Sequence, residues 1–306
     1  MHDVIGDLLP VFILIVVGWA VRAFGVATPE ALGHVNRFGY FVLYPAFLFT
    51  LSSQASVAGG EALRFVGGLL AGFAVMVLLA LALKFFFAKD EGPAFTSVFQ
   101  GSVRWNGFVL LAAAPGLYGA LGPQLIGIAF GPLVLVVNTI CVIVLARWGE
   151  NGATSPRAIL DQIVANPLIL GCVAGLGAQA LGLRHLGPLS NALNLLGQAA
   201  MPVALVCVGS GLDFKAVRAA RVKVAAACFM KLAVAPAAMW GMATLFGASP
   251  LAAAVAAGVG STPTAAAGYT LSREMGGDSR LMAAIITATT LLSFITMPIA
   301  IALTLH

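Results

Sequence analysis

Residues 99–117 read FQGSVRWNGFVLLAAAPGL, and they decide the fold because they place polar residues and helix breakers inside an apolar segment. Arg104 and Asn106 lie within this segment, between Gly101, Gly107 and Pro115. Glycine and proline weaken a helix, and a buried cation is costly unless a partner compensates it. The segment therefore predicts a broken transmembrane helix with a function at the break.

The composition around this segment is that of an integral membrane protein. Hydrophobic residues make up 60% of the 306 residues and charged residues only 9%, far from the averages of soluble domains. Polar clusters and Gly/Pro punctuation divide the chain into ten predicted helices. These are residues 4–22, 35–52, 64–85, 94–117, 122–147, 159–180, 188–211, 222–246, 250–271 and 280–305.

The two halves of the chain repeat each other. PAFLFTLSS (45–53) aligns with PVALVCVGS (202–210) at an offset of 157, which also pairs the fourth predicted helix with the ninth. The ninth carries its own break, GVGSTPTAAAG (258–268). Because each half has an odd number of spans, the second half crosses the membrane with opposite polarity, which predicts an inverted-topology repeat of the secondary-transporter type.

This repeat divides the chain into residues 1–148, an inter-repeat loop at 149–157, and residues 158–306. Basic residues in the short loops predict the orientation, because they gather on the cytoplasmic side of a membrane. Twelve lie on one side: Arg22, Arg37, Lys84, Lys89, Arg147, Arg157, Lys215, Arg218, Arg221, Lys223, Arg273 and Arg280. Only Arg64 and Arg184 lie on the other side, so we expect both termini outside the cytoplasm.

Polar side chains gather at both breaks. They are Gln100, Ser102, Arg104, Asn106, Ser261, Thr262 and Thr264, beside Gly107 and Pro263. Unwound backbone in a bilayer must be covered by protein or a watery cavity, and half-helix N-termini attract anions. The breaks thus predict a substrate site, the alternative being kinks that only aid packing.

Charge and amide groups refine this expectation. Arg104 and Lys231 are the two cations deep inside spans rather than near their ends, and no Asp or Glu occupies the middle of a span. A substrate anion would supply the negative partner that Arg104 lacks. Lys231 either contacts the substrate or extends to the membrane surface. Asn138, in the fifth span, contacts either the ligand or a neighbouring helix.

Several motifs resemble the auxin efflux carrier family, whose bacterial members include transporters described as malonate or malate carriers. They are WNGFVLLAAAP (105–115), NT (138–139), NPLIL (166–170), STPTAAAGYTLSREMGGD (261–278) and ATTLLSFITMP (288–298). The resemblance implies that helices 4 and 9 cross at Asn106 and Pro263. It also implies a scaffold of helices 1, 2, 6 and 7, a transport core of helices 3–5 and 8–10, elevator-type motion, and a homodimer formed through the scaffold.

The architecture of this family extends to bile acid sodium symporters, but this chain has no carboxylate in mid-span for sodium coupling. We expect a secondary transporter or facilitator of a small organic anion, a carboxylate, in the cytoplasmic (inner) membrane, with a proton or sodium as the candidate coupling ion. A sodium-coupled symporter and an anion channel are the alternatives. No catalytic or metal-binding constellation, cofactor motif or nucleic-acid-binding patch is recognisable, so an enzyme is not expected.

Overall fold

The structure is a computed structural model that describes residues 4–54, 60–150, 157, 160–161, 164–183 and 187–305. These residues form helices joined by turns and contain no strand. Within this part of the chain, six helices are long and apolar enough to cross a membrane: Val4–Ala23, Gly60–Phe86, Leu121–Trp148, Pro188–Ser210, Arg221–Leu245 and Ser279–Thr304. The chain is an all-α, multi-pass membrane protein, as its composition predicts.

The first half begins with α1 (Val4–Ala23), α2 (Pro29–Phe38), the π-helical stretch η1 (Gly39–Leu43) and α3 (Tyr44–Gln54). It continues with α4 (Gly60–Ala82), the short 3-10 turns η2 (Leu83–Phe86) and η3 (Lys89–Glu91), α5 (Gly92–Val103), α6 (Gly107–Tyr118) and α7 (Leu121–Trp148). The second predicted span starts earlier than residue 35, because Thr28 Oγ1 accepts the Ala31 N–H and Pro29 occupies the first turn.

The second half contains α9 (Pro167–Ala180), α10 (Pro188–Ser210), α11 (Phe214–Ala219), α12 (Arg221–Phe229), the π-helical stretch η4 (Met230–Val234) and α13 (Ala235–Leu245). It ends with α14 (Pro250–Ser261), α15 (Ala267–Glu274) and α16 (Ser279–Thr304). Side chains of Asn166, Asp213, Ser249 and Asp278 cap the helices that follow them. Most of the predicted inter-repeat loop at 149–157, and Arg184, lie outside the described residues.

Two apolar segments are interrupted, and each interruption is short. The first separates α5 from α6 at residues 104–106, and the second separates α14 from α15 at residues 262–266. The other glycines and Pro115, which also predict weakening of these helices, lie within helical turns. A proline inside a membrane helix is tolerated when neighbouring helices and local adjustments satisfy the freed carbonyl.

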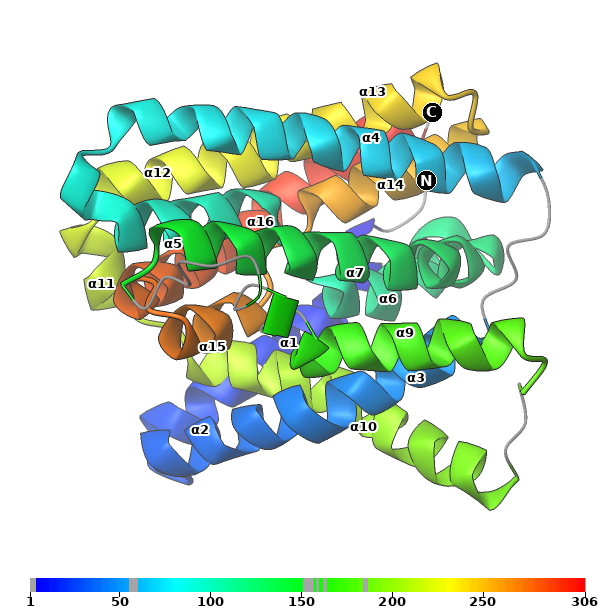
Figure 1. The fold of residues 1–306 in the computed structure, drawn as a ribbon, viewed down its shortest axis with the longest axis horizontal. Helices are drawn as coiled ribbons and strands as arrows, with labels where there is room; N and C mark the ends of the chain where they lie inside the picture. Colours follow the sequence, from blue (N-terminus) through cyan, green and yellow to red (C-terminus); the bar gives the residue numbers. More distant parts are fainter. Residues whose placement is uncertain are drawn as a thin grey trace.

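The helices form two neighbouring groups in the bundle. In Figure 1, α2, α3, α9 and α10 lie along one side, and α4, α12, α13 and α14 along the other. The helix α3 packs against α9 and α10, and α1 packs against α10. A Cβ atom at Gly209 would lie 1.8 Å from the Ile15 carbonyl oxygen, so the backbones of α1 and α10 touch, as small residues allow in membrane helices.

Candidate functional site

The two interruptions contact each other through backbone and side-chain groups. The Asn106 N–H donates to the Pro263 carbonyl oxygen at 3.0 Å and to Thr262 Oγ1 at 3.2 Å. In the reverse direction, Thr264 Oγ1 donates to the Gly101 carbonyl oxygen at 2.7 Å. Each unwound segment therefore satisfies polar groups of the other, which an interior without water requires.

Arg104 lies at the first interruption, and its side chain is 3% exposed. Nε donates to Gln100 Oε1 and Nη1 to Asn138 Oδ1, each at 3.0 Å. Nη2 is buried and has no hydrogen-bond partner. Among the described residues, no Asp or Glu is buried, so two neutral amides hold a guanidinium whose charge is not paired.

Gln100 links this arginine to the second interruption. Its amide accepts from Arg104 through Oε1 and donates from Nε2 to Ser272 Oγ in α15 at 2.9 Å. Gln100 and Ser272 are both fully buried. This chain of bonds fixes the direction of the guanidinium and joins α5 to α15.

A cavity of about 80 Å³ lies beside the guanidinium. Of the residues predicted to bind substrate, Arg104, Asn106, Gly107 and Asn138 line it. Apart from the hydroxyl of Tyr44, which is buried and has no hydrogen-bond partner, the rest of its wall is mainly apolar: Tyr44, Leu48, Trp105, Phe108, Phe130, Val134, Val137, Leu168, Ala204, Val208 and Ala265–Ala267. The cavity thus combines one cationic edge with an apolar body, which is the usual construction of a small-molecule site.

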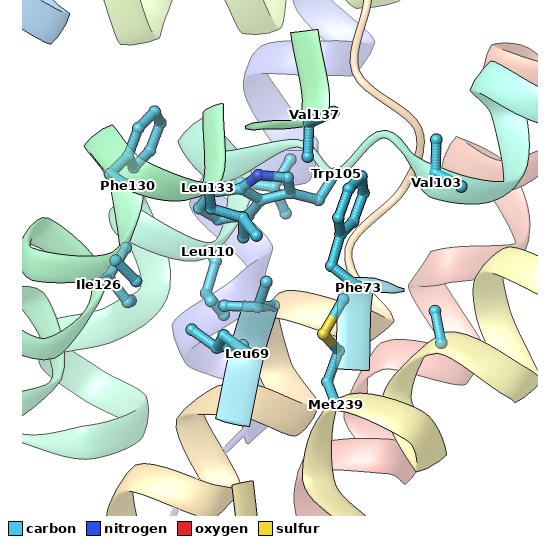
Figure 2. Close-up of a cluster of buried hydrophobic side chains, with 14 of the residues drawn as sticks. Leu69, Phe73, Val103, Trp105, Leu110, Ile126, Phe130, Leu133, Val137 and Met239 are labelled. Carbon is cyan, nitrogen blue, oxygen red and sulfur yellow. The ribbon is translucent and has the colours of Figure 1, made fainter. Parts of the chain in front are cut away.

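Trp105 anchors the break in the hydrophobic core. Its ring lies 4.9 Å from that of Phe130, measured between centroids. Figure 2 shows it among Phe73, Val137 and Leu133, side chains that come from the helices on either side. Because this neighbour of Arg104 is 6% exposed and packed on several sides, the backbone that presents the guanidinium is held in place.

Two half-helix N-termini also face the cavity. Gly107 and Phe108 begin α6, and Ala265–Ala267 lead into α15; all of them line the cavity. Neither N-cap residue, Asn106 or Ala266, caps its helix with a side-chain hydrogen bond. The N-terminal end of a helix carries partial positive charge, so both ends favour an anion. The N–H groups of Val109, Gly268 and Tyr269 in these first turns already bond the carbonyl oxygens of Asn106, Ala265 and Ala266, so an anion would meet the N–H groups that precede them.

The remaining predicted site residues lie outside the cavity wall. Gln100, Ser261, Thr262, Pro263 and Thr264 do not line it. Gln100 bonds Arg104, and Thr262 and Pro263 bond Asn106, two residues that do line it. Lys231 does not line it either, and its Nζ donates to the Gly260 carbonyl oxygen at 2.6 Å. Its side chain is 2% exposed, so it does not extend to the membrane surface.

Sequence reasoning missed the aromatic part of the wall. Tyr44, Phe108 and Phe130 come from α3, α6 and α7, three elements that the chain brings together only in the fold. The run Ala265–Ala267 offered a signal, because small residues directly after a proline break leave room beside the backbone.

A second cavity, of about 300 Å³, adjoins the first and shares Val208 and Ala266 with it. Arg22 and Arg273 line this larger cavity. Both arginines are among the twelve loop cations that the sequence predicts to lie on one side of the membrane.

Comparisons with known proteins bear on the role of the chain as a whole. Residues 153–301 match the family model described as "Membrane transport protein". A protein of Rhizobium meliloti (strain 1021) named "Putative malonate transporter" is 27% identical over 312 residues, which cover 97% of this chain and 94% of that protein. These matches confirm the resemblance to the auxin efflux carrier family and indicate a role in transport.

Proposed function

We propose that this chain, a membrane transporter related to the auxin efflux carrier family, moves a small organic carboxylate across the cytoplasmic membrane and binds it at Arg104. One observation carries this proposal: the buried Nη2 of Arg104 has no partner, at the edge of a cavity that Arg104 itself lines. A carboxylate bound there would accept a hydrogen bond from Nη2 and would also neutralise the charge of the guanidinium.

The chemistry of the cavity favours a compact anion. A guanidinium and two uncapped helix N-termini supply donors, and the described wall contains no acidic residue. One carboxylate can bond Nη2, and a second acceptor on the same molecule can bond an N–H of a half-helix. Malonate is the first substrate to test because the Rhizobium meliloti relative is named for it.

We further infer ten spans arranged as two inverted five-helix repeats, residues 1–148 and 158–306, with helices 4 and 9 crossing at Asn106 and Pro263. The equivalence of the interruptions supports this, since Trp105 plus the offset of 157 falls on Thr262. The hydrogen bond from Asn106 to Pro263 supports it too. In this arrangement the substrate binds where the two unwound segments meet.

The transport motion we propose is an elevator. Helices 1, 2, 6 and 7 correspond to α1, α2–α3, α9 and α10, and the contacts of α3 with α9 and α10 and of α1 with α10 support their role as one scaffold. The other six spans would carry Arg104 and the cavity past this scaffold. A homodimer formed through the scaffold helices would hold it still in the bilayer.

The proposed orientation places both termini outside the cytoplasm, because the basic side of the chain faces inward. The larger cavity then opens toward the cytoplasm, and the conformation is one in which substrate exchanges with that side. An anion channel would show a continuous pore with rings of like residues. Two short helix interruptions that bond each other support a carrier instead.

Uptake of labelled carboxylates into proteoliposomes tests the proposal. The panel contains malonate, malate, acetate and an aromatic monocarboxylate, each with and without imposed proton and sodium gradients. A carrier gives saturable uptake that unlabelled substrate inhibits. Uptake that stays linear with concentration would favour a channel, and the absence of specific uptake for every organic anion would overturn the proposed substrate class.

A further inference from the structure

Lys231 is the second buried cation of the chain, and the substrate cavity does not use it. It lies in η4, between α12 and α13, with its side chain 2% exposed. Its Nζ lies 2.6 Å from the Gly260 carbonyl oxygen in α14. An ionisable residue inside a membrane protein is a candidate for function, and for Lys231 that function is not contact with the cavity beside Arg104.

The backbone around Lys231 is shaped to present it. The Ala235 N–H bonds the Met230 carbonyl, which is the spacing of a π-helix, and Pro236 follows directly. Proline has no N–H to continue the α-helical pattern, and a π-helical turn is a common local adjustment at functional sites. The turn changes the direction in which Lys231 leaves the helix.

Close approach of two backbones brings its partner within reach. A Cβ atom at Gly260 would lie 2.5 Å from Pro236 Cα and 2.6 Å from the Ala235 carbonyl oxygen. Glycine is therefore required at residue 260 for α13 and α14 to touch here. This contact places the end of α14 directly beside the ammonium.

Each of three successive carbonyl groups at the end of α14 accepts a hydrogen bond from a side chain. Ser261 Oγ donates to the Gly258 carbonyl and Thr262 Oγ1 to the Val259 carbonyl, each at 2.9 Å. The next carbonyl, that of Gly260, accepts from Lys231. A helix C-terminus carries roughly half a negative elementary charge, and among the described residues no buried acid adds to it. The ammonium is thus the positive charge that this helix end attracts.

We propose that the Lys231 ammonium occupies a monovalent-cation position at the end of α14, in place of a metal ion, so that transport requires neither Na⁺ nor K⁺. Carbonyl groups at the C-terminal end of an unwound membrane helix are ligands for such cations. Here the chain supplies the cation itself. This role is separate from substrate binding, since Lys231 does not line the cavity beside Arg104.

The first test uses the unaltered protein. Its thermal unfolding midpoint in detergent, and its uptake rate in proteoliposomes, are measured in chloride salts of choline, Na⁺ and K⁺ at equal ionic strength. We expect the uptake rates to agree within about twofold across the salts, and the unfolding midpoints to agree within experimental error, because no free cation has to bind. A requirement for Na⁺ or K⁺ would overturn the proposal.

The second test removes the ammonium and offers a substitute. Lys231→Ala leaves space beside the Gly260 carbonyl, and Lys231→Met fills the space without charge. In choline chloride we expect uptake by both variants to fall on the order of tenfold or more, with lower unfolding midpoints. Ammonium or methylammonium should restore the midpoint and uptake of Lys231→Ala but not of Lys231→Met, because only the first has room.

Two outcomes would contradict the assignment. Wild-type stability and uptake in Lys231→Met would show that no cation is needed at the position, and a folded Lys231→Ala that no small cation stabilises would show that the position does not bind one. If Lys231→Ala does not fold, Lys231→Arg against Lys231→Gln gives the same comparison of charged and neutral side chains. The unfolding midpoints do not depend on which anion is carried, so they remain informative if the proposed substrate is wrong.

Discussion

Nη1 of Arg104 donates a 3.0 Å hydrogen bond to Oδ1 of Asn138, which joins the interruption after α5 to the middle of α7. Asn138 Nδ2 donates to the Val134 carbonyl oxygen at 2.9 Å, and this bond turns Oδ1 toward the guanidinium. An amide orients the arginine without neutralising it. The positive charge therefore stays available to the cavity, which both residues line.

Removal of that charge should weaken substrate binding. Arg104→Gln retains hydrogen-bonding ability but loses the cation, and a charge-assisted hydrogen bond contributes about 1.5 to 3 kcal/mol. We expect the apparent affinity for the carboxylate to fall roughly ten- to hundredfold. Arg104→Lys should restore it in part, because a point charge lacks the bidentate fork. Concentration-dependent uptake measures both effects.

Arg64→Gln is the matched control, since Arg64 is exposed and lines neither cavity. It should leave affinity unchanged. Each variant must remain monodisperse in detergent, so that loss of uptake is not loss of fold. Wild-type affinity in a well-folded Arg104→Gln protein would remove this arginine from substrate binding.

A carboxylate placed at residue 138 should compete with the substrate. Asn138→Asp puts an acid where an amide now accepts from Arg104, and the internal ion pair would use the charge that we assign to the substrate. We expect affinity to fall at least about tenfold while the unfolding midpoint stays near that of the wild type. Asn138→Leu, which removes the acceptor but adds no charge, should lower the midpoint more than Asn138→Asp does.

The fold was predictable from the sequence to the level of apolar spans, because hydrophobic length reports the thickness of a bilayer directly. The positions of glycine and proline alone did not give the exact place of each interruption. Gly101, Gly107 and Pro115 all weaken a helix in isolation, yet only residues 104–106 leave helical geometry. The difference lies in tertiary partners: the Asn106 N–H finds an acceptor in Pro263, which a single-helix argument cannot supply.

The candidate site was predictable where the sequence placed an unusual residue. Arg104, Asn106 and Asn138 are polar groups in apolar surroundings, and they line the cavity. Phe130 also lines it, but the sequence does not show whether a phenylalanine in a membrane helix faces lipid, the protein core or the substrate. For Lys231 the sequence left open whether the side chain contacts the substrate or extends to the membrane surface, and it could not supply the partner seen in the fold, the Gly260 carbonyl.

Cysteine crosslinking tests whether the interruptions meet in the membrane. The Asn106 nitrogen and the Pro263 carbonyl oxygen are 3.0 Å apart, so cysteines at residues 106 and 263 should be joined by a short bifunctional reagent. The four native cysteines, which are buried, are replaced first. A pair at residues 106 and 250 serves as the control, because Pro250 begins α14 at the end away from the break. Equal crosslinking of both pairs, or none at 106 and 263 in folded protein, would contradict the proposed crossing.

Labelling from outside the cell tests the orientation. Arg64 and Lys215 are both exposed and lie on opposite sides according to the charge distribution. A membrane-impermeant maleimide on sealed cells should label Arg64→Cys and should spare Lys215→Cys until the membrane is permeabilised. The physical reason is that twelve loop cations lie on the side of Lys215 and two on the side of Arg64, and basic loops remain in the cytoplasm during insertion.

The reverse pattern would invert the topology and place the larger cavity, with Arg22 and Arg273, toward the outside. Labelling of both positions in sealed cells would indicate two insertion orientations, which an inverted repeat with so strong a charge bias should not adopt.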